Sequence, residues 1–342
     1  MKNTNLIIGK INTGKTTGVM FNELEKLINN KENLVILDNR EEYYKTYKNE
    51  LESNNYTTLV FNLKDTEKSN SYNPLMLPYK YYKNGKKDVA MELLHTLSLE
   101  IFKSDNPTSD PFWENAAANY FISLVLILFK EAKEEEINLA SLLIMLNESE
   151  KKIDDERIID KYFSTLSILD NIYIAGSSIV YAPADTRGSI ISVMKQSLNT
   201  YCMREELLNN LSGNEIDLTN LPNKVAIFVI GNESLNRLAN ILIDQLIDCN
   251  KQFTFILDNI CDMPKLLRLN KMLDQKMKSY VIVRDEEILK DKYGKFITTK
   301  FENIMKDNNV SNCKEIGNCD EYPISKSNNI AYFDFLELVK NK

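Results

Sequence analysis

The hydrophobic positions of this chain alternate between short continuous runs and longer stretches with helical spacing. Continuous runs are typical of strands buried on both faces of a parallel sheet, whereas a repeat of three and four residues is typical of helices. Near the N-terminus strand-like runs alternate with helical stretches, which predicts a β-α-β-α-β start. The three predicted strands are Asn5–Ile8, Asn33–Asp38 and Thr58–Phe61.

From about residue 88 to residue 162 the pattern changes, and apolar residues recur only at helical spacing. A stretch of this kind predicts consecutive helices without intervening strands. The three clearest helices are 89–102, 111–133 and 138–146. Strand-like runs then return, at 224–230, 253–258 and 279–283.

This order predicts one discontinuous domain with an insertion. We expect an α/β domain with a mainly parallel sheet in residues 1–80 and 180–342, and an inserted all-α domain at 81–179. The segment after Gly294 is polar and mixed, and we expect one weak strand there, at Ile330–Phe335.

Residues 9–16 read G-x-x-x-x-G-K-T, directly after the first predicted strand and before a predicted helix. This context is typical of a phosphate-binding P-loop, because glycines let backbone N–H groups turn towards anionic oxygens at the start of a helix. In such a loop Lys15 neutralises the β- and γ-phosphates, and the Thr16 hydroxyl ligates Mg²⁺. We therefore expect ATP and Mg²⁺ as ligands. The expected nucleotide contacts are Gly9, Asn12, Thr13, Gly14, Lys15, Thr16 and Thr17.

The apolar run 253–258 ends in a single carboxylate, Asp258. A P-loop ATPase needs such an acid at the end of a strand to steady its Mg²⁺, so we assign Asp258 as the second metal-binding residue beside Thr16. The next position, where a water-activating glutamate is expected, holds Asn259. An amide cannot take a proton, so the sequence predicts nucleotide binding with weakened hydrolysis.

Other carboxylates are candidates for the missing base. Glu42 and Glu41 follow the predicted strand that ends at Asp38, which we expect beside the P-loop strand. Either one is a candidate base, but acidic residues also commonly open a helix because they interact favourably with its dipole. Asp262 is a weaker candidate.

Composition narrows the class of protein. The net charge is −7 and the pI is near 5.2, which argues against an overall cationic surface for nucleic acid. The most basic stretch, 80–87, interleaves lysines with tyrosines, which fits a local nucleic-acid contact or, as we favour, a solvated connector. The five cysteines and the single histidine, His95, show no metal-ligand spacing.

Five stretches, taken in order, resemble the conjugative coupling ATPases of type IV secretion systems, the TraG/TraD-like proteins related to FtsK and HerA translocases. The fourth, D-P-F-W-E-N-A-A, is the most distinctive after the P-loop and contains the only tryptophan. The stretches are the P-loop with Thr17-Gly18, residues 37–42 (family pattern Asp then Pro-Lys-Gly-Glu), residues 72–75, residues 110–117, and residues 187–192 with 216–218.

The resemblance covers residues 1 to about 294 and implies a RecA-like nucleotide-binding domain with an all-α insertion. It also implies a ring, hexameric in this family, and ATP-driven movement of single-stranded DNA or relaxase-bound DNA towards a secretion-channel protein. By the same likeness Arg187 approaches a neighbour's nucleotide, although a structural salt bridge is the safer interpretation.

The chain also departs from the family pattern. Members usually begin with transmembrane helices, whereas no apolar run here is long enough to span a bilayer. We therefore expect no intrinsic membrane span and a cytoplasmic location, with a partner providing any membrane contact. A family Gln-Ser pair is replaced by Arg284-Asp285, and we expect Arg284 to contact phosphate or to pair with Asp285 or Glu286.

Three functions fit these observations. The first is a coupling-type ATPase with slow hydrolysis, and the second is a nucleotide-binding pseudo-ATPase that organises partners as a scaffold. The third is a P-loop NTPase or kinase unrelated to DNA movement, which the segment 110–117 argues against.

Overall fold

The computed structural model describes residues 4–103, 110–306, 313–327 and 329–341. The chain divides into two compact units, which we call unit 1 (residues 1–70 and 218–325) and unit 2 (residues 71–217 and 326–342). These boundaries differ from the expected ones near residues 80 and 180. The reason is packing: the helices next to the expected boundaries pack on other helices of unit 2.

Unit 1 is built on a seven-stranded sheet of order β3-β6-β2-β7-β8-β1-β9, in which all neighbouring strands are parallel. The six strands predicted by continuous apolar runs are all present, because the central strands are buried on both faces. The strands are β1 (Thr4–Ile8), β2 (Leu34–Leu37), β3 (Thr57–Asn62), β6 (Val225–Ile230), β7 (Thr254–Asp258), β8 (Ser279–Val283) and β9 (Asn303–Lys306).

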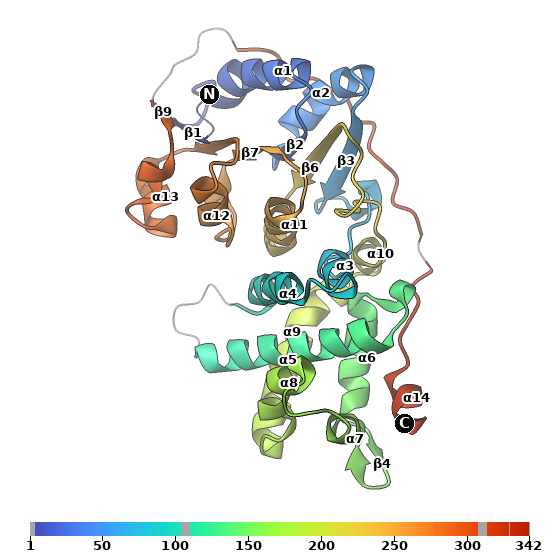
Figure 1. Cartoon of the computed structure of the whole chain (residues 1–342). Coiled ribbons are helices and arrows are strands. Elements are labelled where there is room, and N and C mark those ends of the chain that lie inside the picture. Colours follow the sequence, from blue (N-terminus) through green and yellow to red (C-terminus); the bar gives the residue numbers. More distant parts are fainter. Residues whose placement is uncertain (1–3, 104–109, 307–312, 328, 342) are drawn as a thin grey trace. The chain divides into compact units, whose positions relative to one another are not determined.

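Helices cover both faces of this sheet, as Figure 1 shows. One face carries α1 (Phe21–Asn29) and α2 (Glu42–Ser53), and the opposite face carries α11 (Asn236–Asp248), α12 (Leu269–Asp274) and α13 (Glu286–Tyr293). Between the sheet and the first pair of helices lies an aromatic core. In it the ring of Phe21 meets Tyr43 and Tyr47 edge to face, with centroids 5.6 and 5.1 Å apart.

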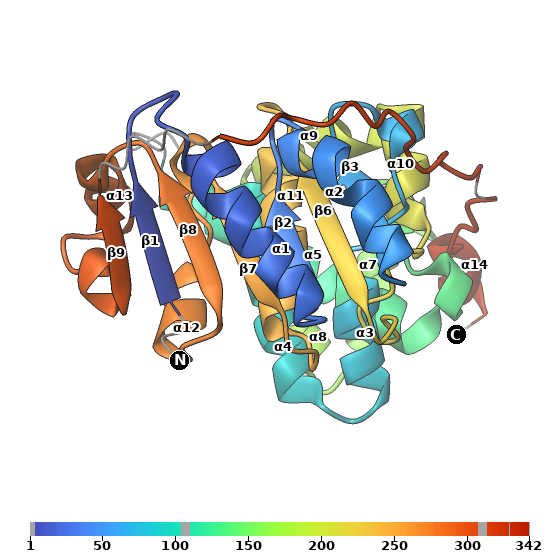
Figure 2. The ribbon, with the colours of Figure 1, turned by 90° about the horizontal axis from the view of Figure 1, so that it is seen from above.

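The strand order corrects one expectation. The strand that ends before Asp38, β2, pairs with β6 and β7, not with the P-loop strand β1. β7 and β8 lie between β2 and β1, as Figure 2 shows. The carboxyl ends of parallel strands nevertheless share one edge of the sheet, so the loops after β1, β2, β7 and β8 still converge there.

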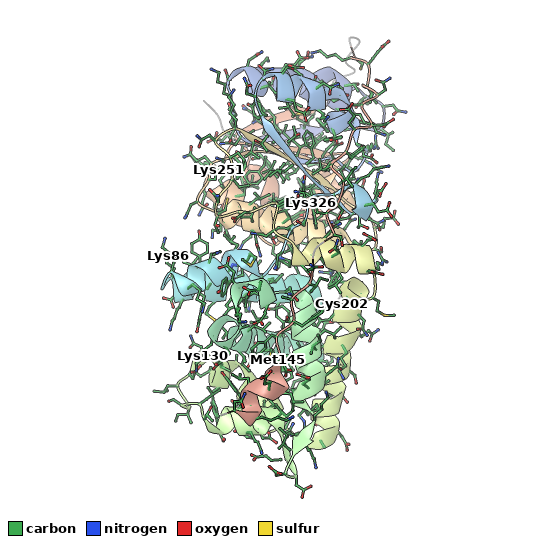
Figure 3. All side chains as sticks on the ribbon, turned by 90° about the vertical axis from the view of Figure 1, so that its right-hand side faces the viewer. Lys86, Lys130, Met145, Cys202, Lys251 and Lys326 are labelled. Carbon is green, nitrogen blue, oxygen red and sulfur yellow. The ribbon has the colours of Figure 1, made fainter. Side chains whose placement is uncertain are left out.

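The described residues of unit 2 are mainly helical, with one short antiparallel pair of strands. Its core includes Met145 of α6, which is fully buried and is labelled in Figure 3. The elements are α3 (Met76–Lys83), α4 (Lys87–Phe102), α5 (Pro111–Glu131), α6 (Leu139–Ser149), β4 (Lys152–Ile153), β5 (Glu156–Arg157), α7 (Ile158–Ser164), α8 (Asn171–Val180), α9 (Ala184–Cys202), α10 (Glu205–Ser212) and α14 (Phe335–Lys340).

The D-P-F-W stretch starts the longest of these helices. The side chain of Asp110 accepts a hydrogen bond from the backbone of Phe112, and Pro111 occupies the first helical position, where a missing N–H costs nothing. By length and composition α5 is a candidate membrane span, but 72% of its apolar window is buried inside the protein. Its apolar side chains are therefore used in the core of unit 2.

Two local expectations were wrong, and one strand was missed. Lys80 to Lys83 belong to α3, so the basic stretch is partly helical, and only the turn around Gly85 is a connector. Residues 330–334 form no strand, and Phe335 begins α14 behind the cap of Asp334. The strand β9 was missed because it lies at the edge of the sheet with mostly exposed side chains, which leaves no apolar run.

Candidate nucleotide-binding site

The P-loop after β1, which leads through the π-helical segment Lys15–Met20 into α1, has the backbone that its sequence predicts. Asn12 and Gly14 adopt left-handed conformations, with φ of 62° and 79°. Such angles suit glycine and asparagine best. The carbonyl of Gly14 accepts hydrogen bonds from the next helical turn, and an added Cβ at Gly9 would lie 2.8 Å from Oγ1 of Thr13. The loop therefore needs both glycines to fold back on itself.

Lys15 lies across this loop. Its Nζ donates to the carbonyls of Gly9 and Lys10, at 2.5 Å each. Burial lowers the pKa of Lys15, the charge of Asp258 opposes this, and the guanidinium groups of Arg40 and Arg284 lower the pKa further. Lys15 therefore shares its surroundings with two more cations.

Asp258 lies at the end of β7, where it meets the P-loop as the sequence predicts. Its Oδ2 accepts hydrogen bonds from the hydroxyls of Thr16 and Tyr43, both at 3.0 Å. Burial raises the pKa of this carboxyl, and the two hydroxyl groups act in the opposite direction. Within the described part of the chain, Oδ1 of Asp258 has no hydrogen-bond partner although it is buried.

This arrangement fits Mg²⁺. A buried carboxylate oxygen that lacks a partner beside a threonine hydroxyl is the donor set that Mg²⁺ takes from a protein before phosphates and water complete its shell. Tyr43, whose hydroxyl orients the carboxylate from α2, was missed in the sequence because a lone tyrosine carries no motif.

The two candidate bases face different surroundings. Glu42 lines the pocket and lies 3.9 Å from Arg40. Burial raises the pKa of Glu42, Arg40 lowers it, and the charge of Asp258 raises it again. Its position suits proton transfer at the pocket, and its role stays a prediction.

Glu41 does not line this pocket. Its carboxylate accepts a hydrogen bond from Tyr322 at 2.6 Å and pairs with Lys64 and Lys45, at 3.3 and 3.8 Å. Partial burial acts to raise the pKa of Glu41, but these partners lower it on balance. Glu41 adopts φ of 62° at the position where the resembled family has glycine. Tyr322, Lys64 and Lys45 hold its carboxylate outside the pocket.

Asp38 is buried beneath the site. Its Oδ2 accepts a hydrogen bond from the backbone of Tyr44 at 2.8 Å, which ties the start of α2 to the end of β2. Burial raises the pKa of Asp38 to about 7, the Tyr44 hydrogen bond opposes this, and the charges of Asp258 and Glu42 raise it further. Asp38 thus fixes the start of α2 through its hydrogen bond with the backbone of Tyr44.

The loops after β7 and β8 carry the two positions that depart from the family pattern. Asn259 and Arg284 both line the pocket. Asn259 has φ of 54°, a conformation that asparagine tolerates better than most side chains. Arg284 pairs with Asp262 at 2.7 Å, not with Asp285 or Glu286 as expected, so Asp262 is already engaged.

A segment far along the chain completes the pocket. Residues 313–325, which we call the strap, run across α1 and α2 in an extended form (Figure 2). Lys314 donates its backbone N–H to Thr17, Gly317 to the side chain of Thr46, and Cys319 to Lys45. Sequence analysis missed the strap because it has neither helical nor strand periodicity.

The strap also contributes directly to the site. Its Ile316, 48% exposed, lines the phosphate pocket, and its Tyr322 stacks on Tyr44 with ring centroids 4.6 Å apart. The pocket has a volume of about 160 Å³. The remaining lining residues are Ile11, Asn12, Thr13, Gly14, Lys15, Thr16, Thr17, Arg40, Glu42, Asn259 and Arg284.

A larger cavity of about 520 Å³ lies at the opposite edge of the sheet, lined by residues such as Lys31, Phe253 and Lys278. It lacks the P-loop and the buried acid, so its size does not make it the phosphate site. Arg187 belongs to unit 2, where it pairs with Glu150 at 3.2 Å as the structural interpretation predicts.

Solved structures of the conjugative coupling protein TrwB share this fold. The complex of TrwB with the non-hydrolysable ATP analogue ADPNP has a TM-score of 0.60 and 12% identity, and covers 88% of this chain and 69% of that chain. The complex with ADP and Mg²⁺ has a TM-score of 0.58 and 11% identity over the same shares. A sulphate complex has a TM-score of 0.59 at 12% identity, covering 89% and 69%. These likenesses confirm the RecA-like α/β fold.

No curated protein matches the sequence significantly. A protein-family model, in contrast, matches residues 4–321, and its description is Type IV secretory system Conjugative DNA transfer. This match confirms the resemblance drawn from the five ordered stretches. Because it spans most of the sequence, the chain belongs to the conjugative DNA transfer family of type IV secretory systems.

Proposed function

We propose that this chain binds ATP with Mg²⁺ and serves as a slowly hydrolysing, coupling-type ATPase in conjugative DNA transfer. One observation carries the proposal: the hydroxyl of Thr16 and the carboxylate of Asp258, 242 residues apart in the sequence, lie 3.0 Å from each other at the P-loop. Such a pair is what a nucleotide-bound Mg²⁺ needs from the protein. The solved TrwB complexes with ADPNP and with ADP and Mg²⁺ support it.

The residues divide the chemistry among themselves. The backbone of residues 9–17 and the amine of Lys15 bind the phosphates, and Thr16 and Asp258 hold the metal. Bound Mg²⁺ supplies positive charge that offsets the charge of the phosphates. Glu42 accepts the proton of the attacking water, and burial makes its carboxylate a stronger base than that of an exposed glutamate.

The wider role is inferred from the family. We infer that the subunits form a hexameric ring and that ATP turnover moves single-stranded DNA, or DNA bound to a relaxase, towards a secretion channel. In this proposal the chain works in the cytoplasm and reaches the membrane through a partner protein. The family match supports conjugative transfer as the setting.

A second function is favoured by one specific observation. Asn259 lines the pocket at the position where the resembled ATPases carry the catalytic glutamate. Without a base, the chain would bind nucleotide and organise partners as a pseudo-ATPase scaffold. The loss of a general base typically lowers a rate by about 10²–10⁴, so binding and turnover separate cleanly in an assay.

Steady-state ATP hydrolysis, with and without single-stranded DNA, tests the proposal. We expect slow turnover in the wild type, loss of turnover in Lys15→Ala, and wild-type turnover in the control Lys26→Ala, because the Lys26 side chain is 67% exposed and does not line the pocket. Tight binding without turnover supports the scaffold. A wild type without any affinity for ATP and Mg²⁺ contradicts both functions.

A further inference from the structure

The cavity of about 520 Å³ lies at the edge of the sheet opposite the P-loop, and we call it the second cavity. Three connections form it, those that lead into β2, β7 and β8, which are neighbours in the sheet. Its volume is within the range of small-molecule sites, which is about 300–1,000 Å³. The lining residues are 31–33, 252–254 and 275–278, all in unit 1.

The inner wall of the second cavity is held by hydrogen bonds. The carboxylate of Glu32 accepts hydrogen bonds from the amine of Lys278 and the hydroxyl of Thr254, both at 2.5 Å. Thr254 is buried, and the side chains of Glu32 and Lys278 are only 24% and 28% exposed. Asn33 joins two of the connections, because its side-chain amide donates to the carbonyl of Gln252 at 3.2 Å. A wall that is ordered before a ligand arrives lowers the entropic cost of binding.

The charges of the lining favour an anion. The lining contains three lysines, Lys31, Lys276 and Lys278, and one glutamate, Glu32. The chain as a whole carries a net charge of −7, so this excess of positive charge is local. A cavity lined by one sign of charge attracts ions of the opposite sign, because its low-dielectric walls focus the field.

Part of this positive charge has a structural use. The helices α1, α11 and α12 all end shortly before lining residues, and lysines near the end of a helix offset its negative pole. This use explains why lysines follow helix ends. It does not explain a cavity between them, or the amide side chains that line it.

Several polar groups at the rim are open to a ligand. In the described part of the chain, the side chains of Lys31, Gln252 and Gln275 form no hydrogen bond or ion pair. Lys276 pairs with Glu302 at 3.5 Å, but its side chain is 70% exposed, so this pair stabilises the fold very little and exchanges readily. Amines bind phosphate as point charges, and amides donate to and accept from the edge of a heterocycle.

The second cavity also has an apolar part. Phe253 and Met277 line it, and the Phe253 side chain is almost completely buried. Side chains of these two kinds pack well against a flat ring. An inorganic anion would leave this surface and most of the volume unused, so the lining fits an organic anion better.

We propose that the second cavity is a ligand site that takes a small organic phosphate of the size of a mononucleotide. Lys31 and Lys276 bind its phosphate, and Gln252 and Gln275 bind the edge of its heterocycle. Lys278 stays paired with Glu32 in the inner wall. The site uses neither the P-loop nor Mg²⁺, so it goes beyond the proposed function and does not depend on it.

Calorimetric titration with AMP in the absence of Mg²⁺ tests this site. AMP lacks the β- and γ-phosphates that a P-loop lysine contacts, so we expect saturable binding that Lys15→Ala leaves within about 2-fold of the wild type. Lys31→Asn and Lys276→Asn should each weaken it by about 10-fold, the loss expected for a hydrogen bond to a charged group. Both variants keep the fold, because φ is 59° and 54° at these positions and asparagine tolerates such angles.

Lys26→Ala is the control for the lysine variants. Lys26 is an exposed lysine of α1 that does not line the second cavity, so this variant should bind AMP like the wild type. Inorganic phosphate should bind at least about 10-fold more weakly than AMP, because it cannot use the apolar part.

Three results would overturn the proposal. They are absence of saturable AMP binding, equal affinity for inorganic phosphate and AMP, and AMP binding that Lys15→Ala abolishes while Lys31→Asn and Lys276→Asn leave it unchanged. A chain that binds AMP in the second cavity but does not bind ATP with Mg²⁺ contradicts the proposed function alone.

Discussion

The two walls of the phosphate pocket differ in how closely they keep the residues of an ATPase. The P-loop wall carries the full motif, and its Thr16 meets the buried acid Asp258. The other wall, formed by the loops after β7 and β8, carries Asn259 and Arg284 where the resembled ATPases carry glutamate and glutamine. The comparison teaches that, under the proposed function, nucleotide binding and turnover depend on separate sets of residues, of which the first matches the motif and the second departs from it at Asn259 and Arg284.

The largest expected effect concerns turnover. Glu42→Gln should lower ATP turnover by about 10²–10⁴, because it removes the proposed base while it keeps shape and hydrogen bonding. Nucleotide affinity should stay close to that of the wild type. Single-turnover hydrolysis measures the rate, and nucleotide titration measures the affinity.

Glu41→Gln is the matched control for this variant. It differs by one position, but the Glu41 carboxylate binds Tyr322 and Lys64 outside the pocket. We expect its turnover to stay within about 3-fold of the wild type, as for the loss of a partly exposed ion pair. Equal losses in both variants would refute the assignment of Glu42.

The next effect concerns Asp258, the proposed ligand of the metal. Asp258→Asn should reduce the gain in ATP affinity that Mg²⁺ provides by about 10-fold or more, because an amide is a weaker ligand than a carboxylate. Tyr43→Phe removes only one hydrogen bond to Oδ2 of Asp258 and should cost about 3-fold. Titrations with and without Mg²⁺ give both values. If Mg²⁺ strengthens ATP binding by Asp258→Asn as much as by the wild type, Asp258 does not bind the metal.

A third effect concerns pH and the floor of the site. Burial raises the pKa of Asp38 to about 7, from 3.8 as its ordinary value. The folded state therefore holds this proton more tightly than the unfolded state, so Asp38 favours folding at low pH and the advantage is lost as the pH rises through about 7.

Between pH 5 and pH 8 this loss amounts to about 3 kcal/mol of unfolding free energy. Asp38→Asn keeps the acceptor for Tyr44 but does not titrate, so its unfolding midpoint should fall less over this range than that of the wild type. Thermal unfolding at the two pH values measures both slopes. Parallel slopes would show that Asp38 does not titrate there.

The smallest effect concerns the strap. An added Cβ at Gly317 would lie 2.4 Å from the carbonyl oxygen of Lys45 and 2.7 Å from Cα of Thr46. Gly317→Ala should lift the strap from α2, displace Ile316 from the pocket and weaken nucleotide binding by about 3-fold, as for the loss of one hydrogen bond. Gly188→Ala, where an added Cβ meets nothing within 4 Å, is the control and should bind like the wild type.

The comparison of the two walls also explains what could be predicted from the sequence. The strands were predictable because the central ones are buried on both faces and therefore read as continuous apolar runs. The meeting of the P-loop with Asp258 followed from the rule that strands of a parallel sheet end at one edge.

Other features depend on tertiary contacts that leave no local pattern. The position of β2 between β6 and β7 is set by crossover connections, which apolar runs do not encode. Backbone hydrogen bonds to Thr17 and Lys45 hold the strap. Almost any residue can form such bonds, so they leave no sequence pattern. The direction of the Glu41 side chain, away from the pocket, depends on Tyr322, a residue 281 positions along the chain.

The most direct test of the account is a titration of the purified chain with ATP, with Mg²⁺ present and then removed by a chelator. The account predicts saturable binding that Mg²⁺ strengthens and that Lys15→Ala weakens by about 100-fold, the upper range for a charged hydrogen bond. Absence of saturable binding, or binding that Lys15→Ala leaves unchanged, would contradict it.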